Sequence, residues 1–327
     1  MKIVLAHNME LVEEPIAMMK KVAQVVTPRD GSEEALLEEV RDADALLVGI
    51  NPPVTRRVFE AAPKLRHVAR MGVGVDIVDL KAATDHGVMV TNVPDVTSDT
   101  VAEFTMTMLL SLARNVVRCD SAVRTGHWHD RLELIQINTE LFGKTHGLIG
   151  MGRIGGRVAI RCKAFGMKVV YYKRTRDLEF EKTQGVEYWP LEKLLRECDT
   201  ISLHTPLTDE TRNMLDRPQF ESMKRTAMLV NQSRGKVVNE KALIQALKEG
   251  LIGGYATDVY ESEPPDPNSE LLRLKNVFLS PHLGGGTRES RVKSGMTIAG
   301  DAIRILRGEI PKNVVNKEVL GKLKQVK

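Results

Sequence analysis

The chain has 327 residues, of which 42% are hydrophobic, and its 47 basic and 43 acidic residues leave a net charge of +4. This composition excludes a disordered or fibrous chain and is sufficient for about two domains, each with its own core. The charges are spread along the chain, which argues against a nucleic-acid partner, and no apolar run approaches the length of a signal or membrane segment. We therefore expect a cytoplasmic protein without membrane contact. Three cysteines without CxxC spacing argue against a disulfide framework or a bound metal.

Residues 1–95 alternate short apolar runs with helical patterns. The runs are KIVLA, AQVVT, ALLVG, RHVAR and VMVTN, and SEEALLEEVRDA is typical of the amphipathic segments between them. A strand-helix repeat of this kind predicts a parallel, doubly wound sheet.

The middle of the chain predicts a second domain of the same class. About 28 residues from Ser98 to the glycine at 126 have helical character, and a new strand-helix series then runs through THGLIG, KVVYY, TISLH, AMLVNQS, GYATDV and VFLSP. A last helix is expected from about Thr287 to Leu306. We predict an outer domain of residues 1–97 and 287–327, an inserted Rossmann domain of residues 98–286, and a cleft between the two.

A glycine-rich turn opens the second series. Gly150, Gly152 and Gly155 follow an apolar strand and begin a helical segment, which is the context that a dinucleotide-binding fingerprint requires. The first glycine allows a tight turn, the second a close approach to pyrophosphate, and the third close helix packing.

The next strand ends in bases where such sites usually carry an acid that binds the adenosine ribose. Lys173 stands 23 residues after Gly150 and is followed by Arg174, Thr175 and Arg176. One charge-assisted hydrogen bond contributes about 1.5–3 kcal/mol, enough to favour a 2′-phosphate by roughly tenfold to a hundredfold. The sequence thus favours NADPH, with NADH as a second cofactor. The alternative is a solvated basic turn that binds NADH, in which Asp177 would reach the ribose although it lies late in the sequence for that task.

Polar residues follow three late strands of the second series. They are Arg234 in NQSRG, Glu263 in DVYESEP and His282 in SPHLGG. Ligands of open α/β sheets bind beyond the carboxyl ends of the strands, so these side chains should converge. Arginine can clamp a carboxylate, histidine can transfer a proton, and glutamate can orient that histidine.

The blocks GMGRIG, SLHTPLTDETRNML, NQSRG, DVYESEP and SPHLGG stand in the order and spacing of one enzyme family. Along essentially its whole length the chain resembles the D-isomer-specific 2-hydroxyacid dehydrogenases. YYKRTR and GEIPKNVVN look most like glyoxylate and hydroxypyruvate reductases.

The resemblance implies a flavodoxin-like substrate domain, a small 2-oxo or 2-hydroxy acid as substrate, and a homodimer with residues 98–125 and Trp128 near its interface. It implies Arg234, Glu263 and His282 as catalytic residues, and Glu261 as a solvated neighbour. It implies that the substrate is bound by Val73, Gly74, Arg234 and His282. The backbone N–H groups of Val73 and Gly74 would hold the substrate carboxylate. Together with the glycine turn and the basic strand end, it gives the nicotinamide cofactor to Gly150, Gly152, Arg153, Ile154, Gly155, Lys173, Arg174, Thr175, Thr205, Pro206, Gln232, Ser233, Asp258 and Gly284.

Two alternative functions stay open. MGVGVD also resembles phosphoglycerate dehydrogenases, so an NADH-dependent 3-phosphoglycerate or D-lactate-type dehydrogenase is the first alternative, although no regulatory domain is expected after PKNVVNKEVL. The second is a nucleotide-sensing protein like the corepressors that resemble this family. Val73 stands where phosphite dehydrogenases have a lysine, which argues against phosphite. His146 occupies a strand position that is usually apolar, and the sequence suggests no function for it.

Overall fold

The computed structural model describes residues 1–7, 9 and 11–325. The chain forms two compact units, Met1–Thr97 with Gly286–Lys327, and Ser98–Gly285. Each unit contains one sheet whose strands are all parallel. The prediction of two parallel α/β sheets is therefore confirmed.

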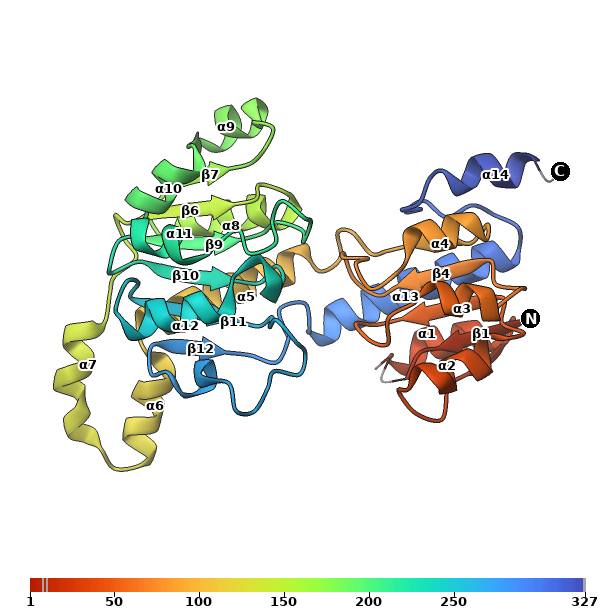
Figure 1. Ribbon diagram of the computed structural model, residues 1–327, viewed down its shortest axis with the longest axis horizontal. Helices are drawn as coiled ribbons and strands as arrows, with labels where there is room; N and C mark the ends of the chain where they lie inside the picture. Colours follow the sequence, from red (N-terminus) through yellow and green to blue (C-terminus); the bar gives the residue numbers. More distant parts are fainter. Residues whose placement is uncertain (8, 10, 326–327) are drawn as a thin grey trace. The chain divides into compact units, whose positions relative to one another are not determined.

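The first unit has a five-stranded sheet in the order β2-β1-β3-β4-β5. Its strands are β1 Lys2–Leu5, β2 Gln24–Val26, β3 Ala45–Val48, β4 His67–Arg70 and β5 Met89–Thr91, and its helices are α1 Glu13–Lys20, α2 Glu33–Val40, α3 Arg56–Ala61, α4 Leu80–Asp85, α13 Arg288–Leu306 and α14 Val319–Gln325. Helices α2, α3 and α4 pack on one face, and α1 and α13 on the other (Figure 1). Helix α13 begins at a capping box on Thr287, and its bounds agree with the last helix expected from about Thr287 to Leu306.

The second unit has a seven-stranded sheet in the order β12-β11-β10-β9-β6-β7-β8. Its strands are β6 Thr145–Ile149, β7 Lys168–Tyr172, β8 Glu187–Tyr188, β9 Thr200–Leu203, β10 Met228–Asn231, β11 Gly254–Thr257 and β12 Val277–Leu279. Its helices are α5 Ser98–Ala113, α6 Val116–Arg124, α7 Arg131–Ile137, α8 Arg153–Ala164, α9 Leu178–Gln184, α10 Leu191–Glu197, α11 Arg217–Ser222 and α12 Glu240–Lys248, with 3-10 turns η1 Trp128–Asp130, η2 Gly235–Val237 and η3 Glu270–Arg273.

Two hydrophobic cores cover the two faces of this larger sheet. Helices α10, α11 and α12 pack on one face, whereas α5 and α8 pack on the other (Figure 1). The strand order changes direction between β6 and β9, so the loops after these two strands diverge and leave space for a ligand at the carboxyl edge. The predicted strands are all present, while the short edge strand β8 was not predicted.

The single helix predicted from Ser98 to the glycine at 126 is wrong, because α5 ends at Ala113. Asn115 adopts a left-handed conformation with φ 48°, which asparagine tolerates better than most residues. Its side-chain Nδ2 donates to Asn138 Oδ1 at 3.0 Å, and the Thr139 amide donates to the Ala113 carbonyl at 2.8 Å. The segment after α7 thus binds the end of α5 and redirects the chain into α6.

Candidate active site

The glycine turn between β6 and α8 has the geometry that the fingerprint predicts. Gly150 has φ 101°, and a Cβ there would lie 2.6 Å from the carbonyl oxygen of His204. A Cβ at Gly155 would lie 2.3 Å from the Gly150 oxygen. A Cβ at Gly152, by contrast, would meet nothing within 4 Å. The first and third glycines are therefore needed for packing, whereas the second faces open space at the N-terminus of α8.

The first residues of α8 extend this site. Arg153, which is exposed, and Ile154, which is half-buried, are the first two residues of the helix and directly follow Gly152. No side chain caps the N-terminus of α8, whose N–H groups and positive dipole end favour an anion.

The basic residues at the end of β7 differ in whether they form an ion pair with another side chain. Arg176 forms two bonds with Glu181, from Nε to Oε1 at 3.1 Å and from Nη2 to Oε2 at 2.6 Å. Lys173 is half-buried and Arg174 is exposed, and neither forms an ion pair with another described residue. Asp177 accepts the Phe180 amide at 3.1 Å as the N-cap of α9. Two cations, with the exposed Thr175 beside them, are thus left for a ligand.

The loop after β9 packs against the glycine turn. The His204 amide donates to the Ile149 carbonyl at 2.8 Å, and the Pro206 carbonyl accepts the Thr211 hydroxyl at 2.7 Å. Thr205 Oγ1 is buried and has no hydrogen-bond partner among the described residues. A buried hydroxyl without a partner is costly, and a ligand could provide the missing bond.

Glu263 and His282 form a direct pair. His282 Nδ1 lies 2.6 Å from Glu263 Oε2, and Glu263 Oε1 accepts the Tyr260 amide at 3.1 Å. Burial favours the neutral carboxyl, but the hydrogen bond and charge of His282 outweigh it, so the pKa of Glu263 is lowered. Glu263 is therefore a carboxylate that holds a proton on Nδ1 and leaves Nε2 as the nitrogen that can face a substrate.

His282 itself lies in an unusual backbone conformation, with φ 54°. A non-glycine residue in the left-handed region costs about 1–3 kcal/mol, and such residues cluster at active sites and ligand-binding segments. The Tyr260 hydroxyl donates to the Ser280 carbonyl at 2.9 Å and thereby ties the Glu263 turn to the His282 loop.

Beside this pair, Gln232, Asp258 and Gly284 form a buried cluster. Asp258 Oδ2 accepts the Gly284 amide at 2.8 Å, and a Cβ at Gly284 would lie 2.7 Å from that oxygen and 2.8 Å from Gln232 Nε2. Asp258 Oδ1 and Gln232 Nε2 are buried without a hydrogen-bond partner among the described residues. Burial raises the pKa of Asp258, against the charge of His282, the Gly284 amide and a side-chain interaction with Gln232. Asp258 Oδ1 and Gln232 Nε2 are thus an acceptor and a donor side by side, an arrangement that a primary carboxamide, such as that of nicotinamide, can match.

Arg234 lies on a turn that Asn231 organises. The buried Asn231 Oδ1 accepts the Ser233 amide at 3.0 Å and the Ser233 hydroxyl at 2.8 Å, and its Nδ2 donates to the Arg234 carbonyl at 3.0 Å. Arg234 Nη1 donates to the Ser233 carbonyl at 2.6 Å. A Cβ at Gly235 would lie 2.0 Å from the Tyr260 carbonyl carbon, so NQSRG packs directly on DVYESEP.

Two residues that support this site, Asn231 and Tyr260, are not among those predicted from the sequence. An asparagine at the end of a strand, two residues before a serine, is a readable signal for an Asx turn. The role of Tyr260 depends on the Ser280 carbonyl, 20 residues further along the chain, so no local sequence pattern predicts it.

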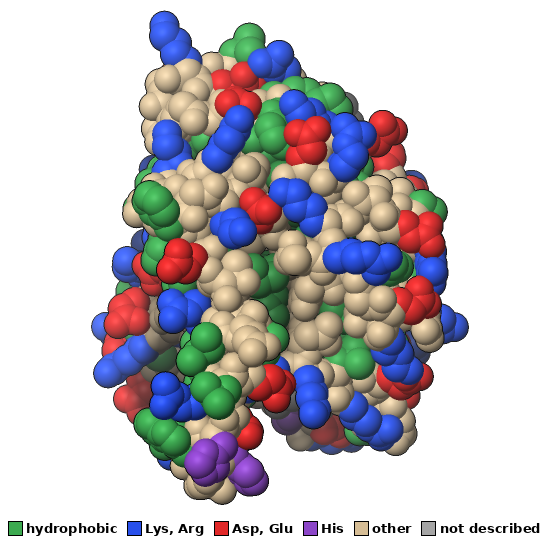
Figure 2. Space-filling view, turned by 90° about the vertical axis from the view of Figure 1, so that its left-hand side faces the viewer, with side chains coloured by type: hydrophobic (Ala, Val, Ile, Leu, Met, Phe, Trp, Pro, Cys, Tyr) green, Lys and Arg blue, Asp and Glu red, His purple; other side chains and the backbone are tan. Residues whose placement is uncertain are grey.

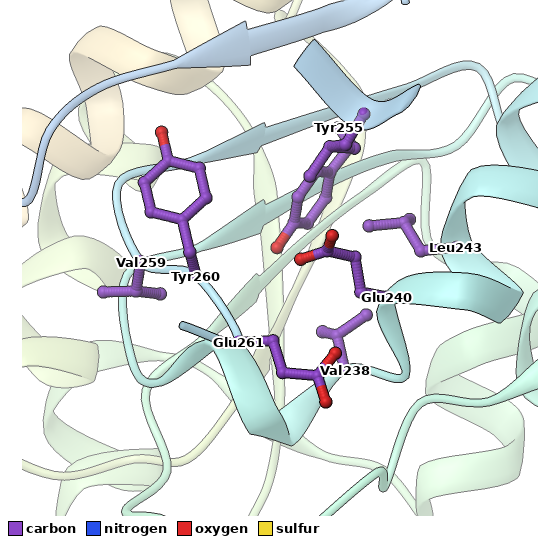
Figure 3. A pocket seen from close by; sticks show the side chains of 9 residues that line it. Val238, Glu240, Leu243, Tyr255, Val259, Tyr260 and Glu261 are labelled. Carbon is purple, nitrogen blue, oxygen red and sulfur yellow. The ribbon is translucent and has the colours of Figure 1, made fainter. Parts of the chain in front are cut away.

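A narrow cavity lies on another side of the Gly235 turn. It is lined by Gly235, Val238, Glu240, Leu243, Tyr255, Val259, Tyr260, Glu261 and Leu271, and Figure 3 shows the side chains of Tyr255 and Glu240 pointing toward each other. Arg234, Glu263 and His282 do not line this cavity, so it is not the candidate active site. Glu261 is exposed beside it, consistent with its expected role as a solvated neighbour.

Val73 and Gly74 belong to the first unit. The preceding Gly72 carbonyl accepts the Val93 amide at 2.9 Å, and the Val73 carbonyl accepts Asn92 Nδ2 at 2.7 Å. The backbone N–H groups of Val73 and Gly74 have no acceptor within residues 1–7, 9 and 11–325. Successive unpaired N–H groups can bind an anion such as a carboxylate.

Neither a membrane span nor a metal cluster is found in the part of the chain that the structure describes. None of the helices there is long and apolar enough to cross a membrane. No group of three or more His, Cys, Asp or Glu side chains there is arranged to hold a metal ion.

The chain resembles known proteins over most of its length. Residues 106–284 match the family described as "D-isomer specific 2-hydroxyacid dehydrogenase, NAD binding domain". A glyoxylate reductase of Korarchaeum cryptofilum is 49% identical over 290 residues, covering 88% of this chain and 87% of that protein. A D-3-phosphoglycerate dehydrogenase of Methanocaldococcus jannaschii is 43% identical, covering 95% of this chain and 60% of that one.

Solved structures agree with the sequence matches. A D-lactate dehydrogenase from Aquifex aeolicus, complexed with NAD and lactic acid, has a TM-score of 0.88 and 29% identity, and the match covers 96% of this chain and 99% of that one. The resemblance predicted from the sequence blocks is confirmed: the chain belongs to the family of D-isomer specific 2-hydroxyacid dehydrogenases.

Proposed function

We propose that this protein is an NADPH-preferring reductase that converts glyoxylate and hydroxypyruvate into glycolate and a D-2-hydroxy acid. The 2.6 Å bond between His282 and Glu263, beside the unpaired atoms of Asp258 and Gln232, is the observation that carries the proposal. It unites a proton donor with a position for a nicotinamide carboxamide. The similarity to glyoxylate reductases over 88% of the chain supports the substrate class.

The two units have different roles in this proposal. The unit Ser98–Gly285 binds the dinucleotide, and the unit with Val73 and Gly74 binds the substrate carboxylate through backbone N–H groups. Arg234 provides a guanidinium for the carboxylate and carbonyl oxygens of the substrate.

A reduced nicotinamide, when bound, would supply the hydride for the carbonyl carbon of the substrate. As negative charge develops on the carbonyl oxygen, Arg234 stabilises it, and His282 delivers the proton from Nε2. Glu263 keeps the second proton of the imidazolium on Nδ1, so the ring donates in a fixed orientation. The remaining neutral imidazole regains a proton from solvent.

Lys173 and Arg174 select the phosphorylated cofactor in this proposal. Arg176 is excluded from the set of phosphate ligands because both of its bonds go to Glu181. Thr175 provides a hydroxyl at the same strand end, and Asp177 is occupied as a helix cap.

The assembly that we propose is a homodimer formed through the arm of residues 116–137, which comprises α6, η1 and α7. Its large apolar side chains are open to solvent: Trp128 is 62% exposed and Leu132 is 66% exposed. Figure 1 shows α6 and α7 extending away from the sheet of their unit, and Figure 2 views the molecule from that side. Exposed apolar surface on this scale is typical of interaction sites.

Replacing Leu132 and Ile135 by glutamate should convert a dimer into a monomer, measured as mass by light scattering. Leu178→Glu provides a matched control, since Leu178 is equally exposed at 66% but lies on α9, outside the arm. A wild-type monomer, or a dimer that survives both substitutions in the arm, would rule out this interface.

The function itself is tested by initial rates with glyoxylate, hydroxypyruvate, 3-phosphohydroxypyruvate and pyruvate, each with NADPH and with NADH. We expect the highest kcat/KM for glyoxylate or hydroxypyruvate with NADPH. Best turnover of 3-phosphohydroxypyruvate or pyruvate with NADH would replace the proposal by the phosphoglycerate or D-lactate alternative. Nucleotide binding without any turnover would point to a sensing protein.

A further inference from the structure

A row of polar side chains crosses the interior of the second unit. His146 of β6 lies next to Thr200 and Ser202 of the neighbouring strand β9, and all three are fully buried. His146 Nδ1 lies 2.7 Å from Thr200 Oγ1, and His146 Nε2 lies 2.9 Å from Ser202 Oγ. Ser202 Oγ in turn lies 2.8 Å from His204 Nε2. A histidine at a core position is thus the centre of a continuous hydrogen-bonded row.

The protons in this row are interdependent. Burial lowers the pKa of His146 and of His204 to about 3, so both rings are neutral at working pH. A neutral imidazole has one donor and one acceptor nitrogen, and the Ser202 hydroxyl has only one proton. If Ser202 donates to His204, it must accept from His146, and His204 then carries its own proton on Nδ1. The reverse direction leaves Nδ1 of His204 without a proton, so the tautomer of His204 depends on His146.

The row ends at the proposed nucleotide site. The His204 backbone lies against the turn, where a Cβ at Gly150 would be 2.6 Å from the His204 oxygen. The next residue, Thr205, has the buried hydroxyl that lacks a partner among the described residues. The ring of His204 therefore belongs to the residue whose backbone forms a wall of the glycine turn and that precedes Thr205.

We propose that His146 is a positioning residue for the nucleotide: through Ser202 it fixes the ring of His204 and holds the loop of residues 204–206 in the shape that receives the cofactor. This inference rests on the proposed function of the second unit.

The other unit provides a matched control. His67 lies on β4, is equally buried, and forms a hydrogen bond from Nε2 to Thr91 Oγ1 at 2.8 Å. Its pKa is also lowered to about 3 by burial. Replacing His67 by leucine removes one buried hydrogen bond and replacing His146 removes two, so we expect both changes to lower thermal stability, the His146 change by more. Only the His146 change should affect the nucleotide.

The test measures the Kd of NADPH by calorimetry, with kcat at saturating NADPH, for the wild type, His146→Leu, His146→Gln and His67→Leu. His146→Leu should raise Kd about tenfold with kcat within about twofold, whereas His67→Leu should leave Kd unchanged. Glutamine, whose terminal amide can reach Ser202, should restore part of the affinity. If His146→Leu does not fold, Ser202→Ala breaks the same link and should raise Kd similarly.

An unchanged Kd in His146→Leu or Ser202→Ala, or an equal rise in His67→Leu, would overturn the proposed positioning role. A wild-type protein that binds neither NADPH nor NADH would instead contradict the proposed function, so the two failures can be told apart. As a second readout, the ring ¹⁵N shifts of His146 should change on addition of NADPH while those of His67 stay fixed. Unchanged His146 shifts would also contradict the proposed link between His146 and the nucleotide site.

Discussion

The two halves of the candidate site in the second unit differ in how many of their polar groups already have partners within the protein. In the cluster of Glu263, His282, Asp258 and Gly284, each residue is already hydrogen-bonded to another member. The nucleotide turn, residues 150–155 with the strand end 173–176, instead keeps open space at Gly152 and leaves Lys173 and Arg174 without ion pairs among the described residues.

This difference separates two physical requirements. Proton transfer needs a fixed donor geometry, so its groups are held by one another before substrate arrives. Binding a polyanion needs accessible N–H groups and cations, which remain solvated until the phosphates displace the water. Substitutions of Glu263 or His282 should therefore reduce turnover, and substitutions in the turn should reduce nucleotide affinity.

The largest effect is expected in the cluster. His282→Ala removes the proton donor, and general acid catalysis typically contributes 10²–10⁴-fold, so kcat with glyoxylate should fall by about that factor. The Kd of NADPH, measured by calorimetry, should change by less than about threefold, or roughly 0.7 kcal/mol. Near wild-type kcat would remove His282 from the mechanism.

A smaller effect is expected from Gly152→Ala, which acts on the turn. Its Cβ enters space that contains no protein atom within 4 Å, so the melting temperature should not fall. The same methyl group would occupy the approach to the α8 N-terminus, and we expect the KM for NADPH to rise about tenfold, or 1.4 kcal/mol. Gly155→Ala is the contrasting variant, because its Cβ would lie 2.3 Å from the Gly150 oxygen and should destabilise the fold itself. Unaltered NADPH affinity in Gly152→Ala would show that the open space is not the nucleotide site.

The smallest change in rate is expected from Glu263→Gln. Because the pKa of Glu263 is lowered, its negative charge is present throughout the working range, and glutamine removes that charge while keeping a hydrogen-bond acceptor. Reduction requires a proton from His282, and glutamine no longer provides the negative charge that faces this ring. The alkaline limb of the pH profile of kcat/KM should therefore move to lower pH by about one unit. A profile that does not move would contradict the pairing.

Much of the fold and part of the candidate site could be predicted from local sequence patterns. The β-branched runs predict the strands, the glycine spacing predicts the turn, and polar residues after buried strands indicate the carboxyl edge where Arg234, Glu263 and His282 lie on adjacent loops. These features depend on residues close in sequence, for which periodicity and turn chemistry are informative.

The features that the sequence did not reveal depend on distant partners. The break after Ala113 requires Asn138 and Thr139, which bind the helix end from beyond α7. The row through His146 requires two hydroxyls on β9, and only the pairing of β6 with β9 brings them together. Arg176 looked equivalent to Lys173 and Arg174 in sequence, but the fold of α9 presents Glu181 to it.

The most direct test of this division is the ratio of kcat/KM for NADPH to that for NADH, measured in the wild type, in the double variant Lys173→Ser with Arg174→Ser, and in His282→Asn. The double variant should lower the ratio by at least roughly tenfold to a hundredfold, because even one charged contact contributes about 1.5–3 kcal/mol. His282→Asn should lower turnover with the two cofactors equally and leave the ratio unchanged. A ratio that survives loss of both bases, or that changes when only His282 is replaced, would contradict the separation of proton transfer from cofactor choice.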